Sequence, residues 1–280
     1  MGAERYPSPR ALLERYDLRA KKSWGQHFLC DEGILDEIAR LAVHAPGERV
    51  VELGSGLGHL TARLLAAGAQ VVAVERDRDM ARVLRGELGE QIELMEADAA
   101  HLDYKALAGA AGRVSVAGNL PYHLTSPILF DLLEQVEFVS SAVFLVQREV
   151  AERLAASPGT KDWGVLSVFL QQRAHVSLER VVPPGAFLPP PKVESAVVAV
   201  TFATTPRVEV SDPELFRALV RAGFGQRRKT LSNALRSCRQ VTAEQLAPAF
   251  EQVGIDPGRR GESLTVAEWA ALERALIQAR

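Results

Sequence analysis

Cysteine is scarce in this sequence, and the two that occur, Cys30 and Cys238, match no zinc-binding spacing. A disulfide framework like that of small secreted proteins is thereby excluded, and a reducing, cytoplasmic setting is favoured. The sequence also lacks any run of about 18 apolar residues, which excludes a transmembrane helix. Its N-terminal residues contain no apolar stretch like that of a signal peptide.

A strong net charge is absent as well, because 33 basic and 35 acidic residues give a formal net charge of −2. The charge is unevenly distributed: residues 205–280 carry +3, which leaves −5 for residues 1–204. Between Phe216 and Thr242 there are seven basic residues and no acidic one. A local basic surface on an acidic body favours binding of a polyanion.

A regular alternation of short apolar runs and helical patterns extends from residue 49 to residue 156. This alternation predicts an α/β fold with a mostly parallel sheet. A proline-rich loop, rather than a helix, joins the last two predicted strands, which suits an antiparallel edge. We predict strands at 49–53, 70–75, 91–95, 113–117, 140–146, 175–182 and 196–202, and helices at 31–43, 59–67, 77–88, 126–133 and 148–156.

The pattern becomes helical and basic after Pro206, so we place a domain boundary there. Residues 1–205 are expected to form the α/β domain and residues 206–280 a small helical domain. Residues 21–30 show no period and are expected to form an ordered loop.

A glycine-rich stretch, Glu52-Leu53-Gly54-Ser55-Gly56-Leu57-Gly58, lies between a predicted strand and a predicted helix. Glycines there let the backbone approach a ligand closely. The dinucleotide fingerprint is Gly-x-Gly-x-x-Gly, but here the third glycine comes one residue early and Glu52 precedes the first. An acid is unfavourable beside a pyrophosphate, whereas it suits a ligand with an ammonium and a sulfonium. S-adenosylmethionine carries both.

Two further acids follow successive predicted strands. Glu75 ends the second strand, where a carboxylate can accept from both ribose hydroxyls, and Asp98 follows the third, where it suits the exocyclic amine of an adenine. The alternative is a tight turn with solvated acids at the strand ends. Three acids in this order favour the cofactor.

The tetrapeptide Asn119-Leu120-Pro121-Tyr122 follows the fourth strand and should face the cofactor's methyl group. The Asn119 amide oxygen and the Leu120 carbonyl can each accept one hydrogen of an amino group, Pro121 stiffens the turn, and Tyr122 offers a stacking face. Catalysis would then be orientation plus electrostatics, without a covalent intermediate, a metal or a dedicated base. An ordinary Asn-x-Pro turn is the alternative.

A target adenine must leave its stack before its amino group can react, and extruded bases are held by aromatic side chains. Tyr122 is one candidate and Phe187, in the proline-rich loop, is another. Packing beneath the loop is an equally good interpretation of Phe187.

Five motifs occur in one order and together make a specific resemblance. The motifs are Lys22-Ser23-x-Gly25-Gln26-His27-Phe28-Leu29, Glu52-x-Gly54-x-Gly56-x-Gly58, Asn119-Leu120-Pro121-Tyr122, Phe187-x-Pro189-x-Pro191-Lys192-Val193-x-Ser195 and Phe224-x-Gln226-Arg227-Arg228-Lys229-Thr230-Leu231. With these motifs, the chain resembles the bacterial small-subunit (16S) ribosomal RNA adenine N6-dimethyltransferases from about Lys21 to Leu264.

This resemblance implies a class I S-adenosylmethionine-dependent methyltransferase fold, Rossmann-like, with a small all-α C-terminal domain that binds RNA. It also implies dimethylation at N6 of two adjacent adenosines in a hairpin loop near the 3′ end of 16S rRNA, and a role in small-subunit biogenesis. The 21–30 loop would cover the cofactor. The cofactor-binding residues that the resemblance implies are His27, Leu29, Gly54, Glu75, Asp98 and Asn119. Gln26 of the 21–30 loop and Glu52, Gly56 and Gly58 of the glycine-rich stretch are predicted to bind the cofactor as well.

The chain departs from many relatives at two of these places. Position 27 is Asn in many relatives, and the imidazole of His27 can still donate or accept a hydrogen bond. Ala97 stands where relatives often have Gly, which leaves the carboxylate of Asp98 in place.

Basic residues in the C-terminal part are expected to neutralise RNA phosphates, which gives affinity without sequence information. The alternative, a solvated helix face, normally mixes charges of both signs. The expected contacts are Arg221, Arg227, Arg228 and Lys229, helped by Arg217, Arg236 and Arg239, with Lys21 and Lys22 extending the surface.

We expect no metal, because the other histidines have no ligand spacing: His44, His59, His101, His123 and His175. We also expect a monomer. Two rival functions remain. One is the sister group of adenine methyltransferases that modify large-subunit RNA and share the cofactor half. The other is a non-catalytic RNA-binding assembly factor, against which the intact Asn119 motif argues.

Overall fold

The computed structural model describes residues 6–21, 24–121, 124–226 and 228–279. The chain forms two compact units. The first contains Met1–Ala151 and Ser177–Phe202, and the second contains Glu152–Val176 and Ala203–Arg280. Among the described residues, no helix is both long and apolar enough to cross a bilayer.

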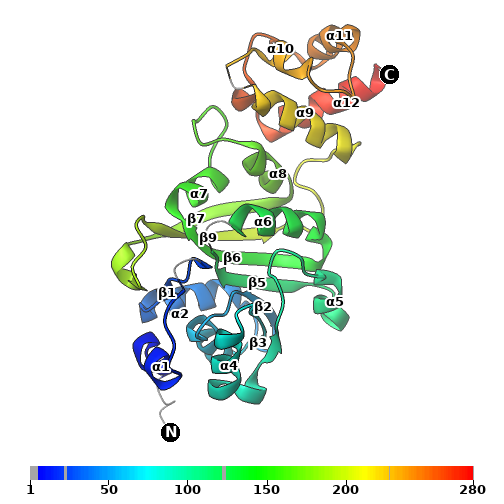
Figure 1. Cartoon of the computed structure of the whole chain (residues 1–280). Helices are drawn as coiled ribbons and strands as arrows, with labels where there is room; N and C mark the ends of the chain where they lie inside the picture. Colours follow the sequence, from blue (N-terminus) through cyan, green and yellow to red (C-terminus); the bar gives the residue numbers. More distant parts are fainter. Residues whose placement is uncertain (1–5, 22–23, 122–123, 227, 280) are drawn as a thin grey trace. The chain divides into compact units, whose positions relative to one another are not determined.

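The sheet of the first unit has seven strands in the order β4-β3-β2-β5-β6-β9-β7. The labels in Figure 1 show this order from β3 to β7. Neighbouring strands from β4 to β6 are parallel, whereas β9 pairs with β6 antiparallel, so the predicted mostly parallel sheet with an antiparallel edge is confirmed. The strands are β2 (Arg49–Leu53), β3 (Gln70–Val74), β4 (Glu93–Met95), β5 (Val114–Asn119), β6 (Val139–Gln147), β7 (Ala174–Val182) and β9 (Ser195–Phe202).

Helices connect the parallel strands, as the alternating sequence pattern predicts. Aspartates begin several of them: Asp31 accepts from the Ile34 backbone N–H at 3.0 Å, and Asp77 accepts from the Asp79 N–H at 3.0 Å. The helices are α1 (Pro9–Arg15), α2 (Glu32–Ala42), α3 (His59–Ala66), α4 (Arg78–Glu87), α5 (Tyr104–Ala108), α6 (Thr125–Glu134) and α7 (Arg148–Leu154).

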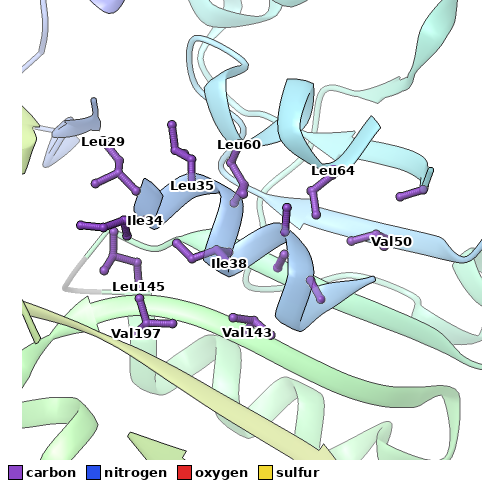
Figure 2. Close-up of a cluster of buried hydrophobic side chains, with 14 of the residues drawn as sticks. Leu29, Ile34, Leu35, Ile38, Val50, Leu60, Leu64, Val143, Leu145 and Val197 are labelled. Carbon is purple, nitrogen blue, oxygen red and sulfur yellow. The ribbon is translucent and has the colours of Figure 1, made fainter. Parts of the chain in front are cut away.

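The amphipathic helix α2 carries part of the core that supports the strand ends. Its apolar residues Ile34, Leu35 and Ile38 lie between side chains of α3 and of the sheet (Figure 2). Those neighbours include Leu60, Leu64, Val143, Leu145 and Val197. These apolar residues form the buried face of α2.

A second, two-stranded sheet was not predicted. In it β1 (Phe28–Leu29) pairs antiparallel with β8 (Phe187–Leu188), where the sequence suggested two loops. Two residues are too short to show a period, and their hydrogen-bonding partners lie far away along the chain. This sheet ties the 21–30 loop to the proline-rich loop.

The second unit is helical and is formed by α8 (Val165–Arg173), α9 (Pro213–Gly225), α10 (Leu231–Leu235), α11 (Ala243–Val253) and α12 (Val266–Gln278). The sequence placed residues 152–176 in the α/β domain, but the structure groups them with these C-terminal helices. Side-chain packing is the reason. The Phe169 and Phe216 rings lie 6.1 Å apart, and the buried Trp163 indole N–H donates to the Leu264 carbonyl at 3.1 Å.

Candidate active site

A cavity of about 240 Å³ opens at the carboxyl ends of the parallel strands of the first unit. Its lining includes the glycine-rich loop after β2, Glu75 after β3, Asp98 after β4 and Asn119 at the end of β5. In open α/β sheets ligands bind at this edge, where the strand order reverses. Here β2 is flanked by β3 on one side and β5 on the other.

The three glycines of the loop all adopt the left-handed backbone conformation that favours glycine, with φ of +70° at Gly54, +55° at Gly56 and +84° at Gly58. The Gly54 N–H donates to the Val74 carbonyl at 2.8 Å, which continues the β2–β3 pairing beyond the strand end. Gly54 and Gly56 line the cavity. Gly58 precedes α3 and is not part of that lining.

Glu75 holds the loop in place. One carboxylate oxygen accepts from the Gly56 N–H at 2.8 Å and the other from the Asp77 N–H at 2.7 Å. Each oxygen keeps a second lone-pair direction, so both can still accept from a ligand's hydroxyl groups. Burial raises the pKa of Glu75 above its usual value.

Glu52 is buried beneath the loop and lines the cavity. Its carboxyl group accepts from the Thr61 hydroxyl at 2.5 Å. Burial and the nearby Glu75 raise the pKa of Glu52 to about 8, while the Thr61 and Ser55 hydroxyls oppose that rise. A cationic ligand would relieve this cost, because an opposite charge favours the ionised form.

Asp98 also lines the cavity. It accepts from the Ala100 N–H at 3.1 Å and from the Arg76 guanidinium at 2.8 Å, and these contacts hold the pKa of Asp98 below its usual value. Arg76 also lies over the ring of Trp24, 5.0 Å from the centroid. Trp24 and Arg76 line the cavity together with Asp98, so an acid, a base and an aromatic ring form one part of its lining.

Asn119 is oriented by the loop that covers the cavity. Its side-chain nitrogen donates to the His27 carbonyl at 2.7 Å. A carbonyl can only accept, so the nitrogen end of the amide must face His27, and the oxygen end is left as an acceptor. Leu120 is pinned by its N–H to the Leu145 carbonyl at 3.1 Å. No described residue donates to the Leu120 carbonyl, so it is a second acceptor beside Asn119.

The 21–30 loop is fastened by its own side chains. The Gln26 amide donates to Asp77 at 2.8 Å and accepts from the Lys21 N–H at 2.8 Å. The His27 ring bonds the Pro189 carbonyl at 2.7 Å. Leu29 is buried in the core and also lines the cavity. Gln26, His27 and Leu29 therefore lie at the cavity as predicted, and the Gln26 amide is engaged in holding the loop.

The described residues fit S-adenosylmethionine and offer no alternative metal site. Three carboxyl groups, from Glu52, Glu75 and Asp98, surround a cavity that a cationic, hydroxyl-bearing ligand would satisfy. Among the described residues no group of three or more His, Cys, Asp or Glu side chains could hold a metal ion.

The profile of the family "ribosomal RNA adenine dimethylase" matches residues 17–278. The chain belongs to the ribosomal RNA adenine dimethylase family. It is 67% identical to the Ribosomal RNA small subunit methyltransferase A of Anaeromyxobacter dehalogenans (strain 2CP-C), over 98% of this chain and 99% of that protein.

Solved structures have a similar fold. A dimethyladenosine transferase from Plasmodium falciparum matches with a TM-score of 0.76 at 23% identity, over 90% of this chain and 98% of that one. The 23S rRNA methyltransferase ErmE matches with a TM-score of 0.69 at 26% identity, over 90% of this chain and 100% of that one. As a member of the adenine dimethylase family, the chain is an S-adenosylmethionine-dependent methyltransferase with the class I fold.

Two residues that were predicted to contact the cofactor or the target base, Gly58 and Phe187, are not part of the cavity lining. Phe187 is only 5% exposed, belongs to the same core cluster as Leu29 and is not part of the cavity lining, so the packing interpretation describes it. Lys21 was expected to contact RNA. Its ammonium pairs with Asp77 and Asp79, each at 2.7 Å, so in this structure it holds the loop, and its contact with RNA stays a prediction.

Tyr122, Lys22 and Arg227 lie outside the described residues. The sequence reasoning missed Trp24 and Arg76. Trp24 stands at an unassigned position of the first motif, and Arg76 directly follows Glu75, so a basic residue beside a strand-end acid was the available signal.

The basic residues of the second unit that were predicted to contact RNA are exposed where the structure describes them. Arg217 and Arg221 lie four residues apart on the exposed face of α9, and Arg228 and Lys229 follow in the connection to α10. Together with Arg236 and Arg239, none of these side chains forms an ion pair with a described residue.

Proposed function

We propose that this chain transfers methyl groups from S-adenosylmethionine to N6 of two adjacent adenosines in a hairpin loop near the 3′ end of 16S rRNA. The product is N6,N6-dimethyladenosine, and the reaction belongs to small-subunit biogenesis. The observation that carries the proposal is the Asn119 amide, whose oxygen is left as an acceptor by the bond to the His27 carbonyl at 2.7 Å, inside the same cavity as the glycine-rich loop.

Asn119 and Leu120 act on the target amine. The lone pair of an adenine amine is delocalised into the ring, which makes the nitrogen a poor nucleophile. Two acceptors that bind the two amino hydrogens draw the nitrogen towards tetrahedral geometry and aim its lone pair. They also stabilise the positive charge that develops on the nitrogen. The methylated amine is acidic and releases its proton without a dedicated base.

Cofactor binding is divided among the acids at the strand ends. Glu75 offers an acceptor to each of two ribose hydroxyls, and Asp98 suits the adenine amine. Glu52 supplies negative charge beneath the loop. When bound, S-adenosylmethionine supplies an electrophilic methyl group on a sulfonium.

RNA binding is assigned to the second unit, through Arg221, Arg228 and Lys229 and, by its place in the motif, Arg227. Tyr122 is the proposed stacking partner of the extruded base. We further propose that the chain acts as a monomer, without a metal, in the cytoplasm.

Modification of large-subunit RNA is the second candidate, because the 23S rRNA methyltransferase ErmE has a similar fold. The 67% identity to a small-subunit enzyme favours small-subunit RNA over the 26% identity to ErmE.

The test is to incubate the purified chain with labelled S-adenosylmethionine and each purified ribosomal subunit, and to locate the label by mass spectrometry. We expect two adjacent dimethyladenosines near the 3′ end of small-subunit RNA. Label confined to large-subunit RNA would overturn the substrate, and RNA binding without any label would leave an assembly factor.

A further inference from the structure

An N-terminal segment, residues 6–16, packs against the outer side of the glycine-rich loop. It precedes residues 17–278, which the family profile matches, and the sequence analysis assigned it no role. Its helix α1 buries Leu12 in a cluster with Phe28, Leu57 and Met80. The cluster joins this segment to Leu57 of the loop and to α4.

Tyr6 reaches the loop directly. Its hydroxyl donates to the Leu57 carbonyl at 2.8 Å, and its ring meets the His59 ring edge-on at 5.2 Å. His59 in turn donates from its ring to the Pro7 carbonyl at 2.9 Å, and burial lowers the pKa of His59 to about 4, so the ring is neutral. Leu57 and His59 line the cavity, whereas Tyr6 and Pro7 do not.

The absence of a side chain at Gly58 leaves room for the Tyr6 hydroxyl. A Cβ at Gly58 would lie 2.5 Å from the Tyr6 hydroxyl oxygen and 3.0 Å from a Leu84 methyl group. Because Gly58 lies outside the cavity lining, this contact, together with its positive φ, explains the third glycine of the motif without a ligand.

Tyr16 fixes the far end of the segment on α4. The Tyr16 hydroxyl donates to the Glu87 carboxylate at 2.9 Å, and Arg15 pairs with the same carboxylate at 2.8 Å. The backbone carbonyl of Tyr16 accepts from the Arg82 guanidinium at 2.9 Å. A Cβ at Gly86 would collide with the Tyr16 hydroxyl. Glycine inside a helix lowers helix stability by about 1 kcal/mol relative to alanine. At position 86 this cost goes with the room that glycine leaves for Tyr16.

We propose that Tyr6 is a positioning residue for the cofactor site, which holds the second half of the glycine-rich loop in its binding conformation. A loop with three glycines loses much conformational entropy when it is ordered. When the folded protein has already ordered the loop, the entropy cost of ordering it no longer weakens ligand binding. Tyr6 therefore acts on cofactor affinity and not on the methyl-transfer step. The inference rests on the proposed cofactor site.

The experiment compares Tyr6→Phe with Tyr16→Phe in the full chain. Both changes remove one hydroxyl from the same segment, but only the Tyr6 hydroxyl bonds the loop. The Kd for S-adenosylmethionine is measured by calorimetry, and hydrogen exchange of residues 54–58 is measured without cofactor.

For Tyr6→Phe we expect a Kd about two- to tenfold higher, corresponding to one hydrogen bond, with faster exchange in the loop and unchanged kcat at saturating cofactor. Tyr16→Phe should lower the thermal midpoint while leaving Kd and loop exchange as in the wild type. Unchanged loop exchange in Tyr6→Phe would overturn the inference, and so would an equal loss of affinity in both variants. A wild-type chain that fails to bind the cofactor would overturn the proposed function instead, and loop exchange would still test Tyr6.

Discussion

Charged side chains around the cavity of the first unit are held by hydrogen-bonding partners, whereas those of the basic surface of the second unit are exposed. Around the cavity, Glu75 is held by two backbone N–H groups, Asp98 by Arg76, and Lys21 by two aspartates. The arginines and the lysine along α9 and α10 are exposed and form no ion pair with a described residue. A site for a small ligand must be pre-organised, whereas a polyanion needs charges that remain available to phosphates. The sign of a side chain's charge therefore predicts less about its function than the groups that it pairs with.

The largest expected effect comes from the cavity. Asn119→Ala removes one acceptor for the amine and should lower methyl transfer by about 100- to 1,000-fold at saturating cofactor, by analogy with removal of one oriented hydrogen-bonding group from an active site. RNA binding should be retained. Turnover is measured by transfer of labelled methyl groups to small-subunit RNA.

Gln135→Ala is the matched control, because the Gln135 amide donates to the Leu102 carbonyl at 2.7 Å and is not part of the cavity lining. This variant should lose stability and keep kcat. Undiminished turnover of Asn119→Ala would remove the role assigned to that amide.

The next effect concerns the basic surface. Arg221→Ala combined with Arg228→Ala should weaken RNA binding and make the logarithmic salt dependence of the affinity shallower by about one to two units, because two phosphate contacts are lost. Cofactor affinity should not change. Arg10→Ala with Arg19→Ala removes two exposed charges from the first unit and should leave the slope alone. Equal slopes in all three proteins would place the RNA elsewhere.

The buried acid Glu52 predicts how the stability of the folded chain changes with pH. Glu52 has a pKa of 4.5 when exposed and of about 8 in the folded chain, so the folded state binds the proton more tightly. The contribution of Glu52 to stability is therefore greatest below pH 4.5 and falls as the pH rises towards 8, by at most about 1.4 kcal/mol per pH unit. Glu52→Gln should flatten this part of the pH profile of the thermal midpoint, measured without cofactor. The exposed Glu134→Gln serves as the control, and an identical slope in Glu52→Gln would contradict the burial argument.

The smallest expected effect concerns Lys21, a basic residue of the first unit that was predicted to contact RNA. Lys21 is basic but its pKa is raised by hydrogen bonds to Asp77 and Asp79. Lys21→Ala should raise the Kd for the cofactor by no more than about fivefold, as expected for a half-exposed ion pair, and leave the salt slope of RNA binding unchanged. A shallower slope would return Lys21 to the RNA surface.

Much of the fold could be predicted because its signal is local. Strand β2 occupies the predicted residues 49–53, and α2 lies within the predicted 31–43. The strand-end residues Glu75, Asp98 and Asn119 also meet at one cavity, because parallel strands end at the same edge.

What the sequence could not predict depends on partners far along the chain. Strands β1 and β8 are two residues each and exist only as a pair. Phe187 had two equal interpretations, and only the core around it decides between them. Lys21 looked like part of a basic surface until its aspartate partners were known. Charge, aromatic character and spacing are visible in a sequence, whereas these partners are not.

The most direct test of the account is a crystal structure of the chain with bound S-adenosylmethionine. We predict that its ribose lies on Glu75 and its methyl carbon faces the end of β5. A nitrogen placed about 3–3.5 Å from that carbon would then meet the Asn119 side-chain oxygen and the Leu120 carbonyl. A methyl carbon directed away from these two oxygens, or an Asn119 amide whose oxygen faces His27, would contradict the account.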